Sequence, residues 1–278
     1  MRHSLTALIS LSLLCLQAPV FALSTSHHHH EAAMSIPAEL NWSPENQTKI
    51  DQFFQAGDLK GQVAVFDADE TLWRHDVGEG FLKFLQERSK LAMVPPGFDA
   101  FKRYEELCAQ NKWMGYPYAA QVMAGMSVTD VEALAKEYFE NHFKQNVYPA
   151  QKALIQRLQA AGVDVYIVSA SNQWIINAGA PALGVPLDHA IGVRLEVAQQ
   201  QVTAHIIPPM TFRQGKVDAI KKYIGKQPVL VSGDSITDYE MLQYASRLQL
   251  VINPKDKNAP EENIFRLASQ HAWAIQRW

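Results

Sequence analysis

The feature that most constrains the fold is an alternation of short apolar runs and helical stretches in the second half of the chain. Ala150–Ala161 has the pattern of a helix that ends at Gly162, and Val163–Val168 has that of a buried strand. Strands that alternate with helices predict a doubly wound, mainly parallel sheet with helices on both faces, so the expected fold class is α/β. The further elements expected are a helix over Asn172–Ala178, two strands over 190–207 that turn at Gln199–Gln201, a helix over Lys216–Ile224, a strand over Val229–Ser232, a helix over Asp238–Ala245 and a strand over Leu248–Ile252.

The first half of the chain contains one further strand signal and then a long helical stretch. The run Gln62–Phe66 is short and rich in valine, which favours a buried strand. From about Glu79 to Lys144 apolar residues recur at helical spacing, and Ser127 begins a sequence typical of a helix cap. This stretch therefore predicts a helical insert. The expected organisation is a lead-in over 23–58 with a short helix near Pro44–Gln55, an α/β core over 59–77 and 148–278, and a helical cap over 78–147.

The first residues have the pattern of a secretory signal peptide. Arg2 precedes the apolar run Leu5–Leu16, and Val20 and Ala22 occupy the −3 and −1 positions of a cut after Ala22. The apolar run is too short to serve as a membrane anchor. We therefore expect a periplasmic or secreted protein with residues 1–22 removed. The run His27–His30 is interpreted as a polar terminus rather than as a metal site.

Composition excludes several classes of protein. The chain has 278 residues, of which 47% are hydrophobic and 19% charged, as expected for a folded domain with an insert. A net charge of −3 provides no basic field for a nucleic-acid backbone, so DNA or RNA is not an expected partner. The only cysteines are Cys15 and Cys108, and removal of the first leaves one thiol, which rules out an internal disulfide. The sequence leaves the oligomeric state open.

Reactive polar residues follow three of the expected strands. Asp67 and Asp69 follow the first, Ser169 ends the second, and Asp234 and Asp238 follow the third. Ligands of open α/β sheets bind at the carboxyl ends of the strands, so these side chains should converge on one crevice. Two carboxylates about 4 Å apart repel by about 4 kcal/mol at an effective dielectric of about 20, so some must be protonated or a cation must lie among them. Oxygen ligands suit Mg²⁺, and such a site with hydroxyl donors suggests phosphoryl chemistry.

Four segments resemble, in order, the motifs of the haloacid dehalogenase superfamily of phosphatases. Residues 63–71, VAVFDADET, resemble its first motif, and Ile167–Ser169 resemble its second. Gly215 and Lys216 resemble the third, a basic residue that opens a helix, and residues 233–238, GDSITD, resemble the fourth. The resemblance implies a Rossmann-like core. The helical stretch between the first two motifs resembles the inserted cap of the phosphoserine-phosphatase-like branch.

This resemblance implies a role for each strand-end residue. Asp67 would be the nucleophile that forms an aspartyl-phosphate, Asp69 the general acid, and Lys216 the residue that offsets charge on the intermediate. The implied Mg²⁺ ligands are Asp67, Asp69 through its main-chain carbonyl, and Asp234, with Asp238 supporting them. The residues implied near the phosphoryl group are Ser169, Ala170 and Thr71, of which Thr71 is the one expected to brace the loop.

A narrower resemblance connects the chain to bacterial phosphorylcholine phosphatases through residues 115–125, 162–171 and 215–220. It implies a small phosphorylated amine or amino alcohol, whose quaternary ammonium would be met by aromatic rings or an acid. Trp73, Tyr116 and Glu79 are the candidates for this role. Two positions depart from that group: Glu70 stands where Asn is usual, and Gly78 where a second acid is expected.

Other functions are compatible with the same residues. Within the same chemistry, the alternatives are a phosphoserine phosphatase and a broad-specificity acid phosphatase. From a different class, the alternatives are a receiver-like signalling module and a non-catalytic protein that binds a phosphorylated ligand. The acid pair Asp67 and Asp69 favours turnover, because binding alone requires no second acid.

Overall fold

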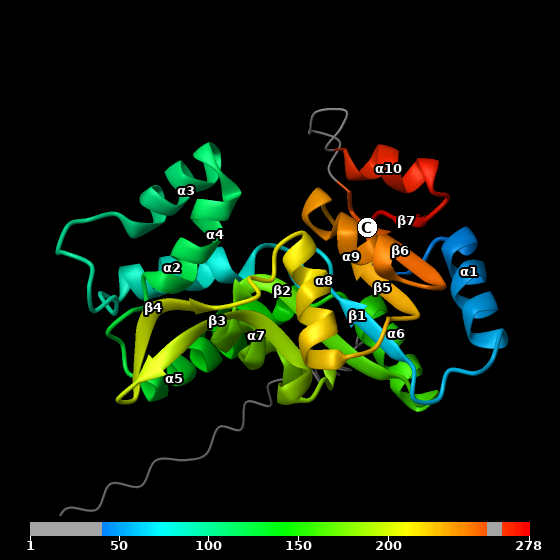
Figure 1. The fold of residues 1–278 in the computed structure, drawn as a ribbon, viewed down its shortest axis with the longest axis horizontal. Helices are drawn as coiled ribbons and strands as arrows, with labels where there is room; N and C mark the ends of the chain where they lie inside the picture. The colour runs from blue at the N-terminus through cyan, green and yellow to red at the C-terminus, as the bar shows by residue number, and fades with distance from the viewer. Residues whose placement is uncertain (1–40, 255–262) are drawn as a thin grey trace, which may run out of the picture. The chain divides into compact units, whose positions relative to one another are not determined.

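The structure, a computed structural model, describes residues 41–254 and 263–278. Its centre is a seven-stranded sheet with the strand order β4-β3-β2-β1-β5-β6-β7 (Figure 1). All neighbouring strands pair in parallel except β3 and β4, which are antiparallel. The expected mainly parallel α/β fold is therefore confirmed. The strands are β1 (Val63–Phe66), β2 (Asp164–Asn172), β3 (Ala190–Ala198), β4 (Gln201–Ile207), β5 (Leu230–Gly233), β6 (Leu248–Ile252) and β7 (Ala274–Gln276).

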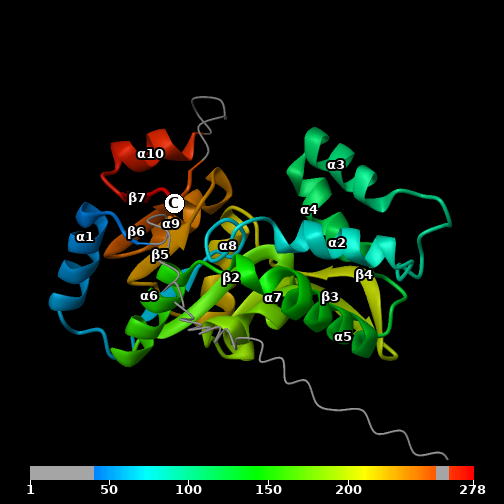
Figure 2. The same ribbon diagram turned by 180° about the vertical axis from the view of Figure 1, so that it is seen from behind.

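Helices cover both faces of this sheet. Side chains alternate along a strand, so the central strand β1 buries Ala64 and Phe66 in one apolar cluster and Val63 and Val65 in another. Helices α6 and α7 contribute to the first cluster, and α8, α9 and α10 to the second, as the opposite views in Figures 1 and 2 show. The described helices are α1 (Pro44–Gln55), α2 (Val77–Glu87), α3 (Ala100–Gln110), α4 (Lys112–Gln121), α5 (Val128–Tyr138), α6 (Pro149–Ala160), α7 (Gln173–Gly179), α8 (Gln214–Ala219), α9 (Tyr239–Tyr244) and α10 (Ile264–Gln270).

Helices α2 to α5 form the insert between β1 and β2. The Ser127 hydroxyl accepts a hydrogen bond from the Asp130 N–H, which is the cap expected at the start of α5. The two segments that connect the insert to the core are bonded to each other. Arg74 N–H donates to the Asn146 carbonyl, at 2.9 Å between nitrogen and oxygen. This pairing places the start of α2 close to the residues that follow β1.

The β3–β4 hairpin extends from the core and packs against the insert. The expected strand pair over 190–207 is present, with its turn at Gln199 and Gln200, whose φ angles are 50° and 62°. Val202 exchanges backbone hydrogen bonds with Gly125 and Met126, which belong to the segment between α4 and α5. The hairpin is therefore hydrogen-bonded to the segment that connects two helices of the insert, α4 and α5.

Two regions differ from the sequence expectation, and a third cannot be compared with it. Strand β2 continues to Asn172, whose side chain caps α7 by accepting from Ile175 N–H, so Ser169 lies inside the strand. At the chain's end, α10 and β7 add a helix and an edge strand that the sequence analysis did not include. The signal peptide and the histidine run fall outside the described residues. Within the described part, no helix combines the length and apolar character needed to span a bilayer.

Candidate active site

Asp67 lies at the carboxyl end of the central strand and is held from three sides. Its N–H donates to the Ser232 carbonyl on β5 at 2.9 Å. Its carboxylate accepts from the Thr71 hydroxyl at 3.1 Å and from the Lys216 ammonium at 2.5 Å. Burial, followed by the neighbouring Asp238 carboxylate, raises the pKa of Asp67 to about 7 against the opposing effect of Lys216. The side chain is therefore buried and oriented, and its pKa lies close to neutral pH.

Lys216 joins Asp67 to a second buried acid. Its ammonium donates to Asp238 at 2.5 Å, and both side chains are excluded from solvent. The other Asp238 oxygen accepts from the N–H groups of Asp234 and Ser235, at 3.1 and 3.2 Å. Burial opposes charge on Lys216, but the two carboxylates outweigh it and hold the lysine pKa above its ordinary value. Asp238 therefore acts as a support, because both of its oxygens are already engaged.

Three carboxylates converge on a site that suits a metal ion. Ligand atoms of Asp67, Asp234 and Asp238 lie within 4.8 Å of one another. Burial, then the nearby Asp238 and Asp67 charges, raises the pKa of Asp234 well above its ordinary value. Only one of the buried charges here, Lys216, is positive, so a dication would offset the remaining negative charge. An all-oxygen donor set fits Mg²⁺, and of the three acids Asp67 and Asp234 line the cavity and would bind it, whereas Asp238 does not line it.

The Asp69 side chain is directed away from this cluster. One of its oxygens accepts from the Trp73 indole N–H at 2.9 Å and from the Val77 N–H at 2.7 Å, and the other accepts from the Ser171 hydroxyl at 2.6 Å. Burial raises the Asp69 pKa even though these hydrogen bonds lower it. Asp69 is therefore a fixed carboxyl group with a raised pKa, as a proton donor requires.

Three of the residues expected near the phosphoryl group or the head group do not line the cavity, although one of them, Thr71, is expected only to brace the loop. Trp73 is fully buried and holds Asp69, so its ring does not face a head group. Thr71 is also fully buried, and its hydroxyl braces Asp67. Ser169 is buried in β2, where its hydroxyl accepts from Ser171 N–H at 3.1 Å. The sequence could not show the position of Trp73, which depends on how the loop after β1 packs, nor that β2 continues past Ser169.

Ala170 and Ser171, rather than Ser169, reach the cavity from β2. The cavity has a volume of about 660 Å³ and lies between the carboxyl ends of the strands and the cap helices. From the core, Asp67, Asp69, Lys216 and Asp234 line it, as expected. From the cap, the expected Glu79 and Tyr116 line it, together with Asp76, Lys83, Tyr104, Lys112 and Tyr138.

The two departures from the phosphorylcholine phosphatase pattern have structural consequences. Glu70 has a φ angle of 58°, in the left-handed region that Asn adopts more readily than Glu. Gly78, in the first turn of α2, packs directly on β2, because a Cβ atom there would lie 2.5 Å from the Ser171 hydroxyl oxygen. A side chain at Gly78 would require the Ser171 hydroxyl to move, and this hydroxyl donates to Asp69.

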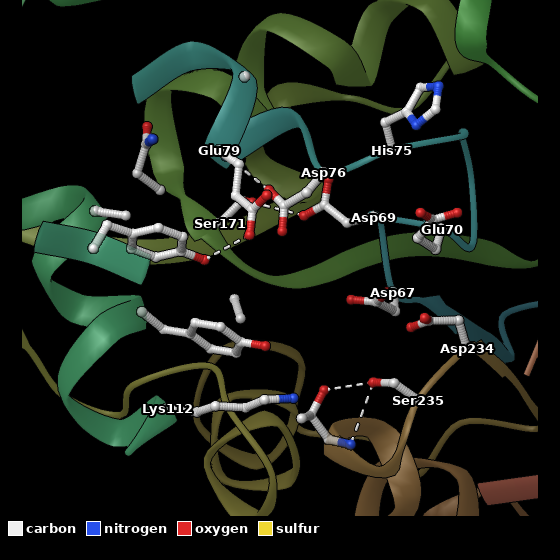
Figure 3. Close-up of a pocket in the computed structure, with 18 of the residues that line it drawn as sticks. Asp67, Asp69, Glu70, His75, Asp76, Glu79, Lys112, Ser171, Asp234 and Ser235 are labelled. Carbon is white, nitrogen blue, oxygen red and sulfur yellow. Dashed lines mark hydrogen bonds between the residues drawn. The ribbon is translucent and has the colours of Figure 1, made fainter. Parts of the chain in front are cut away.

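An acidic pair forms the cap side of the cavity. Asp76 caps α2 by accepting from Glu79 N–H at 2.8 Å, and Glu79 accepts from the Tyr104 hydroxyl at 3.1 Å. Desolvation, followed by the charges of Asp69 and Glu79, raises the Asp76 pKa well above its ordinary value. Figure 3 shows the Asp76 and Glu79 side chains beside each other, with Asp76 next to Asp69 and with Asp67 and Asp234 further from the pair. Mutual repulsion within the pair would be relieved by a positively charged ligand.

The sequence analysis did not identify Asp76, Tyr104 or Tyr138 as site residues. For Asp76 a signal existed, because an acid three positions before Glu79 marks a helix start. That signal describes a cap and says nothing of a cavity. Tyr104 and Tyr138 belong to α3 and α5, and no local pattern places these helices beside α2.

The fold and this site define an α/β protein with a helical insert and a buried carboxylate cluster at the carboxyl ends of its parallel strands. The family profile of the haloacid dehalogenase-like hydrolases matches residues 64–243, which extend from β1 into α9. The chain belongs to this family. Together with relatives that are named phosphatases, this membership identifies the chain as a phosphatase. Phosphatases of this family generally use a divalent metal, usually Mg²⁺.

Two curated relatives have phosphatase names. A phosphorylcholine phosphatase of Pseudomonas aeruginosa is 25% identical over 259 residues, which cover 70% of this chain and 74% of the relative. A histidinol-phosphatase of Neisseria meningitidis is 21% identical over 225 residues, which cover 77% of this chain and 97% of the relative. These similarities support phosphate-ester hydrolysis as the reaction. The two relatives are named for different substrates, so their names do not identify the leaving group of this protein's substrate.

Solved structures support the fold. A protein of unknown function from Bordetella pertussis Tohama I superposes with a TM-score of 0.67 and 19% identity, covering 78% of this chain and 98% of that one. A phosphoserine phosphohydrolase-like protein from Francisella tularensis superposes with a TM-score of 0.50 and 19% identity, covering 75% and 99%. At such identities the likeness concerns the fold alone.

Proposed function

We propose that this chain is an exported, Mg²⁺-dependent phosphomonoesterase whose substrate has a positively charged leaving group, with phosphorylcholine as the first candidate. The observation that carries the proposal is the position of the acidic pair Asp76 and Glu79 in the same cavity as Asp67. Export is proposed from the sequence of residues 1–22 alone, and N-terminal sequencing of the mature protein tests it.

The reaction uses the core side of the cavity. The Asp67 carboxylate attacks phosphorus, the bond from phosphorus to the ester oxygen breaks, and the Asp69 carboxyl donates its proton to that oxygen. Asp69 then accepts a proton from the water that hydrolyses the aspartyl-phosphate. Lys216 offsets negative charge beside Asp67 throughout. Asp67 and Asp234 would hold Mg²⁺, which would offset negative charge on the phosphoryl oxygens.

The leaving group would be bound on the cap side. A quaternary ammonium has no N–H to donate, so aromatic faces and carboxylates are the groups that recognise it. Tyr116 and Tyr138 line the cavity near the acidic pair. Burial raises the pKa of Tyr138 to about 12 and also raises that of Tyr116, so both rings stay neutral. The Tyr104 hydroxyl fixes the Glu79 carboxylate in this group.

One observation favours phosphoserine as a second candidate. Lys112, at the start of α4, lines the cavity and extends toward the loop that contains Ser235 (Figure 3). Its ammonium lies 5.9 Å from the centre of the Tyr116 ring, and no described carboxylate is within ion-pair distance of it. A leaving group with both an ammonium and a carboxylate would place the carboxylate near Lys112.

Glu79→Gln and Lys112→Met are expected to separate these two candidates. Loss of the Glu79 charge should raise KM for phosphorylcholine about tenfold, equivalent to about 1.4 kcal/mol of binding free energy. An uncharged aryl phosphate should show little change. Lys112→Met should raise KM for phosphoserine and leave KM for phosphorylcholine unchanged. Steady-state kinetics of phosphate release measures all of these values.

If Glu79→Gln affected the aryl phosphate as strongly as phosphorylcholine, the proposed charge recognition would be wrong. A wild-type preference for phosphoserine, lost in Lys112→Met, would instead establish the second candidate. Both variants conserve approximate side-chain size, and Lys112 is exposed, so neither change should disturb packing.

Metal binding is expected to stabilise the fold in a pH-dependent manner. The folded pKa of Asp67, about 7, lies above its ordinary value of 3.8. Without metal, its contribution to stability is therefore present at low pH and is lost as the pH rises through about 7. Because Mg²⁺ binds the ionised carboxylates, added Mg²⁺ should raise the thermal midpoint more at about pH 8 than at about pH 6.

Thermal unfolding with Mg²⁺ and with a chelator measures this effect, and phosphate release should disappear with the chelator. Asp234→Asn provides the matched variant, because it removes one proposed ligand and should reduce the Mg²⁺-induced shift. An equal shift in wild type and Asp234→Asn would place the metal elsewhere.

A further inference from the structure

Gln151 is a fully buried amide directly behind the active site. It lies in the first turn of α6 and is absent from the cavity lining. Its Nε2 donates to the Thr71 carbonyl at 3.1 Å and to the Ser232 hydroxyl at 3.0 Å. Thr71 belongs to the loop after β1, and Ser232 belongs to β5. One side chain therefore connects α6 to two segments that carry the catalytic groups.

Both residues that accept hydrogen bonds from Gln151 are also hydrogen-bonded to Asp67. The Thr71 hydroxyl donates to the Asp67 carboxylate at 3.1 Å, and the Asp67 N–H donates to the Ser232 carbonyl at 2.9 Å. Gln151, Thr71, Asp67 and Ser232 thus form a closed ring of hydrogen bonds. The ring holds the backbone of Asp67 through one branch and its carboxylate through the other.

The orientation of the Gln151 amide follows from its acceptors. If the amide were flipped, Oε1 would face the Thr71 carbonyl, and both atoms can only accept. In the observed orientation, Oε1 is buried and has no hydrogen-bond partner. An unpaired buried acceptor opposes folding, and an apolar residue of the same length would avoid it. The stability of the fold therefore does not explain why an amide occupies this position. The two hydrogen bonds that the amide donates do explain it.

We propose that Gln151 is a positioning residue that fixes the direction of the Asp67 carboxylate for attack on phosphorus. The proposal rests on the proposed role of Asp67 as the nucleophile. Small misplacements of a reacting group reduce the rate of the chemical step and leave substrate binding largely unchanged. Gln151 should therefore affect kcat rather than KM.

Gln151→Met tests this, because methionine has a similar shape but lacks both N–H donors and the unpaired oxygen. We expect kcat to fall at least about tenfold, while KM stays within about twofold and the thermal midpoint changes little. Asn46→Leu is the matched control. Asn46 is also a buried amide whose Nδ2 donates twice, to the Ile275 carbonyl and the Gln276 side chain, but it lies on α1, outside the cavity lining. It should lower the thermal midpoint and leave kcat unchanged.

A double-mutant cycle with Thr71→Val identifies the route of the effect. If Gln151 acts through Thr71 on Asp67, the double variant should lose little more kcat than the worse single variant. Ser232→Ala removes the second acceptor and should lower kcat by a smaller factor, which keeps the test available if Gln151→Met fails to fold.

Unchanged kcat in Gln151→Met or in Ser232→Ala would overturn the proposal, as would independent effects that multiply in the cycle. Asp67→Asn, measured in parallel, distinguishes a failure of the nucleophile assignment from a failure of the role proposed for Gln151. An active Asp67→Asn variant would refute the proposed nucleophile, whereas an inactive one beside a fully active Gln151→Met would refute only the role of Gln151.

Discussion

Asp67→Asn is expected to reduce phosphate release by more than about a thousandfold while the protein remains folded. The amide has nearly the same shape as the carboxylate but cannot attack phosphorus. It also removes one of the two carboxylates available to Mg²⁺. Because Asp67 repels Asp238 and Asp69 in the buried site, a neutral side chain should not lower the thermal midpoint. Phosphate release and thermal unfolding are the two measurements.

Asp218→Asn is the matched control for this variant. Asp218 is an exposed acid on α8, where it accepts from the Gln214 side chain at 3.1 Å. Its replacement should change neither activity nor stability by a measurable amount. A folded Asp67→Asn variant with wild-type turnover would show that the nucleophile has been assigned to the wrong residue.

Lys216→Met is expected to impair both stability and activity. The Lys216 ammonium lies between two buried carboxylates, at 2.5 Å from each, so its loss leaves Asp67 and Asp238 without their cation. Removal of one partner from a buried ion pair typically costs about 3–5 kcal/mol of unfolding free energy. Turnover should fall at least about a hundredfold, because charge on the phosphorylated intermediate is no longer offset. Urea unfolding and phosphate release measure the two effects.

The loss of stability in Lys216→Met should depend on pH. Without the ammonium, the folded pKa of Asp67 rises further above its unfolded value, so the contribution of Asp67 to stability is present at low pH and lost as the pH increases through the folded pKa. The variant should therefore be closer to wild type at about pH 5 than at about pH 8. Lys221→Met, an exposed lysine one turn further along, should show neither change. Equal destabilisation at both pH values would contradict the ion-pair explanation.

The catalytic end of the site could be predicted because it depends on local sequence and on one general property of parallel sheets. Asp67 and Asp234 each follow a short apolar strand, and the carboxyl ends of parallel strands lie at one edge. The convergence of these two acids needed no knowledge of how the helices pack, whereas Lys216, on α8, was implied by the family resemblance. The strands that precede the two acids, β1 and β5, are indeed parallel neighbours.

The cap side could not be predicted in the same way. Trp73 was a candidate for the head group, yet it is buried and donates to Asp69. Tyr104 and Tyr138 had no assigned role, yet both line the cavity. The same local patterns, an aromatic residue in a loop or on an amphipathic helix, are compatible with either outcome. Which ring faces the cavity depends on the packing of α2, α3 and α5 against one another.

By itself, the sequence determined the α/β fold class, the helical insert and the group of acids at the strand ends, because strand length, helical periodicity and strand-end residues are local properties; Lys216 was implied by the family resemblance. Only the tertiary structure decided that Asp76 and Glu79 face Asp67 across one cavity, that Ser171 rather than Ser169 reaches it, and that Gln151 lies behind the nucleophile. These relations connect residues far apart in the chain, and they arise from the close packing of side chains between elements, which no local pattern encodes.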